Sequence, residues 1–161
     1  MQSMIEGLMY QLSQIFLLPT LALIAALFLY AVALGGHFAV QAWQRRGSGG
    51  RPLLQRFRSQ PALTADDLDL YAHKLLEPAR IASRVTPMMG LVATMIPMGP
   101  ALKSLSDGNL ASVSENLTVA FSAVILALIS ASLTYWVVNV RRRWLAEELL
   151  EVEALRRGVA P

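Results

Sequence analysis

Several hydroxyl side chains and one carboxylate lie in or beside long apolar segments of this chain. Thr94 lies in one such segment, and Glu115 stands at the start of the next, which also carries Thr118, Ser122, Ser130 and Ser132. A plain membrane anchor would need only aliphatic side chains there. Hydroxyls can hydrogen-bond to water and a carboxylate can also exchange protons, so these residue types predict a helix pair that lines a hydrated path.

Helical spacing brings several of these groups to one side of the second segment. At about 100° per residue, Glu115, Thr118, Ser122 and Ser130 share a sector of about 120°. Hydroxyls are also common where membrane helices pack, because they bond to the backbone or allow close approach. We favour that packing role for Ser130 and Ser132, whereas Thr94 and Ser122 fit both roles equally well.

The composition indicates an all-α integral membrane protein. Of the 161 residues, 55% are hydrophobic and 16% are charged, and the mean hydropathy is +0.47. A helix needs about 20 apolar residues to cross the hydrocarbon of a bilayer. We therefore expect three transmembrane helices, at residues 16–42, 85–102 and 116–140. The middle one contains three prolines, two of which would kink a helix packed within protein.

The distribution of charge predicts the orientation of these helices. Of the 14 Lys and Arg residues, none precedes the first span, eight lie in residues 43–84, one in 103–115 and five in 141–161. Because basic loops stay in the cytoplasm, we expect the tail 1–15 and the hairpin 103–115 to lie outside it. The loop 43–84 and the segment 141–161 would then be cytoplasmic, and the basic charge requires no nucleic acid as a partner.

The two cytoplasmic segments are predicted to be partly helical. Thr64 fits an N-cap, with acidic residues in the first turn that follows. Apolar positions with helical spacing follow in the loop at Leu68, Tyr71, Ala72, Leu75, Leu76 and Ala79, and in the C-terminal segment at Leu145, Leu149, Val152 and Leu155. We expect these faces to form a small bundle. Neither segment is large enough for an active site, so an enzyme is not expected.

No metal site or cofactor is predicted. The chain has no cysteine, and His37 and His73 lack the spacing of a metal site. His37 lies near the inner end of the first span, where an interfacial or packed histidine is the simpler interpretation.

The second span begins with the sequence Arg80-Ile-Ala-Ser-Arg-Val-Thr-Pro-Met-Met-Gly-Leu-Val-Ala-Thr94. This sequence resembles the start of the second span in MotA/TolQ/ExbB proton-channel subunits, where the pattern is roughly A-P-x-x-G-L-L-G-T-V. The resemblance continues through the hairpin and Glu115 to Tyr135 and the basic residues that follow, covering about residues 79–145. Three spans with the N-terminus outside look like the TolQ/ExbB branch, because MotA-type subunits have four.

The resemblance implies a homo-oligomeric ring, usually a pentamer, around a single-span ExbD- or TolR-like partner that carries a membrane aspartate. It also implies a proton-driven motor of the bacterial inner membrane that energises outer-membrane transport. Thr94 matches the family's pore-facing threonine and Glu115 its acid at the outer mouth. Ala120 stands where the third span usually has a threonine, Ala93 replaces a glycine, and Ile129 replaces a proline found in many members.

None of the three spans has an acidic or basic residue near its middle. A charged side chain at that depth is costly and usually functional. A proton path through this chain therefore needs a carboxylate from another polypeptide, which agrees with the partner's aspartate. We expect this chain to be the ring and not the rotor.

Two other functions and a simpler role for Glu115 stay open at this point. Glu115 equally fits an acid that is favoured by the dipole of its helix. A structural scaffold would explain the charged helices, although not the hydroxyls aligned with Glu115. A small metal or solute transporter would explain the proline-interrupted span, but no corresponding pair of broken segments favours it.

Overall fold

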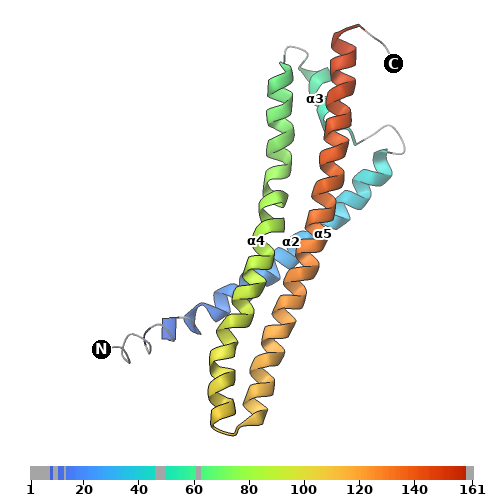
Figure 1. The fold of residues 1–161 in the computed structure, drawn as a ribbon. Coiled ribbons are helices and arrows are strands. Elements are labelled where there is room, and N and C mark those ends of the chain that lie inside the picture. Colours follow the sequence, from blue (N-terminus) through green and yellow to red (C-terminus); the bar gives the residue numbers. More distant parts are fainter. Residues whose placement is uncertain (1–7, 9–10, 13, 46–49, 61–62, 159–161) are drawn as a thin grey trace. The chain divides into compact units, whose positions relative to one another are not determined.

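Helices make up the fold. The structure is a computed structural model and describes residues 8, 11–12, 14–45, 50–60 and 63–158, which contain no strand. The helices are α2 (Leu17–Arg45), α3 (Pro52–Ser59), α4 (Ala65–Ser106) and α5 (Leu110–Arg156), shown in Figure 1. Among the described residues, α2, α4 and α5 are long and apolar enough to cross a membrane. The predicted all-α fold is thereby confirmed, with three helices that could serve as the predicted spans.

The helices extend beyond the spans predicted within them. α4 starts 20 residues before the predicted start of the second span, at Ala65. Its N-cap is Thr64, as predicted: the Thr64 hydroxyl accepts the Asp67 backbone N–H at 3.2 Å, and the Asp67 carboxylate accepts the Thr64 N–H at 3.0 Å and its hydroxyl at 2.7 Å. These hydrogen bonds from Thr64 lower the pKa of Asp67. The helix then continues without a break through Pro78, Pro87, Pro97 and Pro100.

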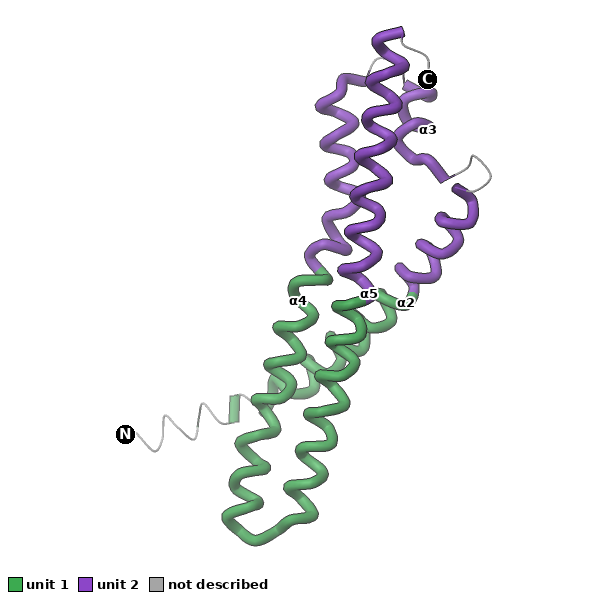
Figure 2. The backbone as a smooth tube through the Cα atoms, turned by 45° about the vertical axis from the view of Figure 1, so that its right-hand side comes forward, with its two compact units in different colours: residues 1–32, 82–132 green, residues 33–81, 133–161 purple. Residues whose placement is uncertain are grey.

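The chain forms two compact units, which Figure 2 colours separately. Unit 1 comprises residues 1–32 and 82–132, and unit 2 comprises residues 33–81 and 133–161. Each of the three long helices contributes residues to both units.

In unit 1, α4 and α5 run antiparallel and side by side, joined by the turn 107–109 (Figures 1 and 2). Gly108 takes a positive φ of 72° there, which costs glycine little. The side chain of Asn109 accepts the Ser112 N–H at 3.2 Å and so caps α5.

Small residues line the contact between these two helices. The buried positions are Ala82, Thr86, Gly90, Ala93, Pro97 and Ala101 on α4, and Ala120, Ala123, Ala127, Ser130 and Ala131 on α5. Ala93, Ala123 and Ala127 also form a core with Ile24 of α2. A Cβ atom built on Gly90 would lie only 2.8 Å from the Cβ of Ala127. Such close approach is how membrane helices associate, since the bilayer offers no hydrophobic drive between them.

Unit 2 contains the small bundle that the apolar spacing predicted. Its two cores join α3, the first turns of α4 and the last turns of α5, and consist of Leu53, Ala72 and Leu145, and of Leu54, Leu68 and Val152. Tyr71, Leu76 and Leu149 pack against these cores, and Ala79 is buried too. Leu75 and Leu155 were also predicted to pack, and this was wrong: both are exposed, at 40% and 47%. Neither belongs to the two cores, and Leu155 lies at the edge of its helix face.

Candidate functional site

The carboxylate and two hydroxyls of α5 lie together on an exposed helix face. Glu115, Thr118 and Ser122 are all exposed in unit 1. Because α5 begins at Leu110, Glu115 lies in the second turn. The helix dipole acts mainly on the first turn, so the simpler role of Glu115 as an acid favoured by that dipole loses much of its support.

Each hydroxyl of the predicted lining donates its proton to its own helix backbone. Thr118 donates to the Ser114 carbonyl at 2.8 Å, and Ser122 donates to the Thr118 carbonyl at 2.8 Å. Thr94 donates to the Leu91 carbonyl at 2.7 Å. A hydroxyl has one proton and two lone pairs, so what remains for water or an ion is acceptor capacity alone. Together with the Glu115 carboxylate, this face suits a cation or the protons of water, and does not suit an anion.

Thr94 lies on α4 at the depth of Ser122. Ala93 packs in the same core as Ala123, and Gly90 faces Ala127 across the antiparallel pair. The register therefore places Thr94, which is partly exposed, at about the same height as Ser122. Both hydroxyls could therefore accept hydrogen bonds from water at the same height along the helix pair.

Two other residues singled out from the sequence are buried. Ser130 is 1% exposed and donates to the Leu126 carbonyl, so the preference for a packing role is confirmed. Ser132, for which the same role was favoured, is exposed, and its packing role stays a prediction. Ala120, the counterpart of the family threonine, is 3% exposed. It is turned by about 140° from Glu115 around the helix, into the buried face of α5. Its missing hydroxyl therefore does not interrupt the face that carries Glu115, Thr118 and Ser122.

A second polar site, in unit 2, was missed by the sequence analysis. The side chain of Glu148 is 2% exposed and forms an ion pair with Arg45 at the end of α2. Its other oxygen accepts the Leu53 N–H at 2.9 Å. The residue before α3, Arg51, provides no side-chain cap, so Glu148 caps this helix from α5. The signal was present in the sequence, because Glu148 lies three residues after Leu145 and four before Val152, on the apolar face.

Neighbouring contacts in unit 2 strengthen the link between α5 and the segments around α2. Arg141 donates two hydrogen bonds to the side-chain oxygen of Gln41, at 3.1 and 2.7 Å. Arg51 pairs with Glu151 at 2.7 Å. Trp144 stacks on Phe38 with ring centroids 5.0 Å apart. By its sequence, the basic and glycine-rich stretch 45–51 is predicted to be a flexible linker that forms a solvated turn. For Arg45 this is wrong, because its side chain is largely buried against Trp144 and Glu148. Residues 46–49 of this stretch lie outside the described residues.

The titration of Glu148 gives a test of this site. Burial raises the pKa of Glu148 above its ordinary value of 4.5, although the Leu53 N–H and Arg45 act in the other direction. The folded protein then holds this proton more tightly than the unfolded chain, so its free energy of unfolding falls as the pH rises above 4.5. Glu148→Gln cannot ionise. The free energy of unfolding of the wild type, minus that of this variant, should therefore decrease from acid to neutral pH. Denaturant melts at several pH values would measure it. An increase of this difference with pH would contradict the raised pKa of Glu148.

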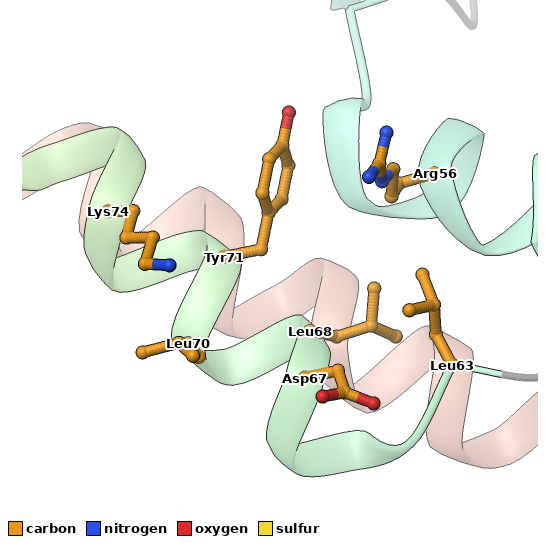
Figure 3. A pocket seen from close by; sticks show the side chains of 7 residues that line it. All are labelled: Arg56, Leu63, Asp67, Leu68, Leu70, Tyr71 and Lys74. Carbon is orange, nitrogen blue, oxygen red and sulfur yellow. The ribbon is translucent and has the colours of Figure 1, made fainter.

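A pocket of about 130 Å³ lies between α3 and the start of α4 in unit 2 (Figure 3). Its lining consists of Arg56, Leu63, Asp67, Leu68, Leu70, Tyr71 and Lys74. The Arg56 guanidinium lies 5.4 Å from the ring centroid of Tyr71, and Asp67 is bonded to Thr64. Because Arg56 and Asp67 already have these partners, we assign no ligand to this pocket. Among the described residues, no group of three or more His, Asp or Glu side chains could hold a metal ion.

Comparison with protein families finds one match. The model of the MotA/TolQ/ExbB proton channel family matches residues 66–154, more than half of the 161 residues. The matched range includes Thr94, the exposed face of α5 with Glu115, and Glu148. Comparisons with curated proteins and with solved structures give no match.

Proposed function

Since the chain belongs to the MotA/TolQ/ExbB proton channel family, we propose that it is the ring subunit of a proton-driven motor. In this proposal several copies, five in the usual arrangement, surround the membrane helix of a single-span partner of the ExbD or TolR type. Proton flow between ring and partner produces mechanical work on the cell envelope, and energises outer-membrane transport. The chain itself performs no enzymatic reaction.

The observation that carries this proposal is the face formed by Glu115, Thr118 and Ser122. It is exposed in the single chain, it offers a carboxylate and hydroxyl lone pairs, and it belongs to a helix long enough to span a membrane. A carboxylate at the outer mouth would concentrate cations there, as charged entrances do. The acceptor groups below it would hold the water through which protons move.

In this proposal the partner supplies the ionisable side chain at mid-membrane depth that this chain lacks. None of the predicted spans of the chain carries an acidic or basic side chain near its middle, whereas a proton needs an ionisable group at that depth. We place the partner's aspartate at the level of Thr94 and Ser122, the hydroxyls of the proposed path that lie furthest from Glu115. In the bacterial inner membrane this arrangement has the N-terminus and the α4–α5 turn in the periplasm, and the segments 43–84 and 141–161 in the cytoplasm, as the basic residues favour.

The proposal predicts that Glu115→Gln slows proton flux. The complex would be purified through a tag on this chain and reconstituted into vesicles, and the flux measured under an imposed pH gradient. Loss of the mouth charge should lower the flux by at least about tenfold, because local cation concentration depends on it. The double variant Thr118→Val with Ser122→Ala should also lower it.

Ser132→Ala is the matched control, because Ser132 is an exposed serine of the same helix that is turned by about 100° from Glu115 and about 80° from Ser122. It should leave the flux unchanged. If the Glu115 and hydroxyl variants conduct like the wild type, the chain is a scaffold and the motor proposal fails. Native mass spectrometry of the purified complex would test for several copies of this chain around fewer copies of a single-span protein.

A further inference from the structure

The polar character of the exposed α5 face ends at Ser122. The next residues on the same side of the helix are Leu126 and Ile129, which are 37% and 51% exposed. At about 1.5 Å per residue they lie about 6 and 10 Å further along α5, towards its C-terminus. Of the hydroxyls near this level on α5, Ser130 is buried and bonded to the Leu126 carbonyl. Ser132 is exposed, but it lies about 4.5 Å beyond Ile129 and is turned by about 60° from it around the helix.

The facing helix is equally apolar at this depth. Gly90 of α4 contacts Ala127 and Val124 in the antiparallel pair, so residues 87–89 lie at about the height of Ile129. They are Pro87, Met88 and Met89. The nearby Thr86 is 1% exposed and donates its hydroxyl to the Ala82 carbonyl at 2.6 Å. Among the described residues, neither helix therefore offers an exposed polar side chain at the levels of Leu126 to Ile129, which end before Ser132.

We infer that Leu126 and Ile129 form a dry barrier below the hydrated part of the proton path. This inference rests on the proposed function, which makes the face with Glu115 and Ser122 the wall of the path. Apolar constrictions exclude water and so block ions. A hydronium ion that reaches Ser122 cannot continue through water, and instead transfers its proton to a carboxylate oxygen of the partner and leaves a water molecule behind. Only movement of that protonated carboxylate past the barrier carries the proton inward.

The barrier thus couples proton flow to motion. Without it, a column of water along α5 would let protons pass while the partner stands still. Ile129 is the key residue, because it is the more exposed of the two and lies deeper than Leu126 along the same face. Its neighbour Leu128 is exposed to a similar extent, 53%, but points about 100° away.

The test compares Ile129→Thr with Ile129→Val in the reconstituted complex. The two variants have nearly the same size and differ by a hydroxyl group, so a difference between them reports polarity and not packing. Passive proton leak would be measured in vesicles with the partner's rotation blocked by cross-linking to the ring. We expect Ile129→Thr to raise the leak by at least about tenfold, corresponding to a barrier lower by about 1.4 kcal/mol, and Ile129→Val to leave it unchanged.

Leu128→Thr is the matched control and should not raise the leak. Equal leak in Ile129→Thr and Ile129→Val, or an equal rise in Leu128→Thr, would overturn the barrier. If that happens while Glu115→Gln still slows driven flux, the motor proposal stands and only the barrier is wrong. If Glu115→Gln also has no effect, both fail together.

Discussion

Gly90→Leu is expected to force α4 and α5 apart in unit 1 and to prevent assembly of the complex. A Cβ at this position would lie 2.8 Å from the Ala127 Cβ and 3.5 Å from Cγ2 of Val124, and leucine adds three more carbon atoms beyond it. Overpacking of a tight contact costs about 1–3 kcal/mol, and more where the backbone must move. Thermal melting of the solubilised protein and its elution volume in gel filtration would measure the loss.

Further variants distinguish the loss of the close helix contact at Gly90 from the general effect of replacing a glycine in a helix. Gly36→Leu is the matched control, because Gly36 lies in α2 and a Cβ added there would meet no atom within 4 Å, so this variant should melt like the wild type. Gly90→Ala should be destabilised, and adding Ala127→Gly should restore stability by moving the missing methyl to the other helix. Wild-type melting of Gly90→Leu, or no rescue of Gly90→Ala, would show that the two helices are not held this closely.

The tight contact explains why the polar face remains exposed. Small residues turn inward so that the backbones of α4 and α5 approach, and the larger and polar side chains are left on the outside of the pair. Met88, Met95 and Met98 on α4 and Glu115 and Ser122 on α5 are exposed for this reason. Unit 1 separates the hydroxyls by burial, since Ser130 is buried whereas Thr118 and Ser122 are exposed, and the part of the exposed hydroxyls in a path stays a prediction.

Hydropathy and helical spacing were sufficient to predict the three spanning helices and the bundle of unit 2. Spacing alone could not assign Ser130, because it gives the angle between residues and not the side on which a neighbouring helix lies. Ser130 falls within the same sector as Glu115 and yet is buried, while Ser122 is exposed. That distinction needs the position of α4, which depends on the contact of Gly90 with Ala127.

The short helix α3 and the role of Glu148 were not predicted, for a related reason. α3 has eight residues between a glycine-rich linker and Pro61, and its N-terminus is capped by a side chain about 95 residues away in sequence. The residues next to a helix start, which are the usual signals of an N-cap, give no indication of a cap that comes from so far along the chain. By sequence Glu148 is one of several acids on a charged helix, because its partners Arg45 and Leu53 come together with it only in the folded unit.

Glu148→Ala is expected to destabilise unit 2 by about 3 kcal/mol, the usual cost of removing one partner from a buried ion pair. It would leave the largely buried Arg45 without its counter-charge and the Leu53 N–H without an acceptor. α3 should then detach, since no side chain of its own caps it. Hydrogen exchange would show this as faster exchange at Leu53 and Leu54, together with a lower melting temperature.

Glu147→Ala provides the comparison, because Glu147 is an exposed neighbour whose contact with Arg143 is 3.7 Å long, and such pairs contribute little. It should leave exchange in α3 unchanged. Replacing both charges, Arg45→Met with Glu148→Met, should cost less than Glu148→Ala alone, because no unpaired charge then stays buried. If the double variant is the least stable of the three, the ion pair itself holds α3 in place. If it recovers much of the loss, burial of Leu53 and Leu54 holds the helix, and the charges mainly fix which part of α5 it packs against.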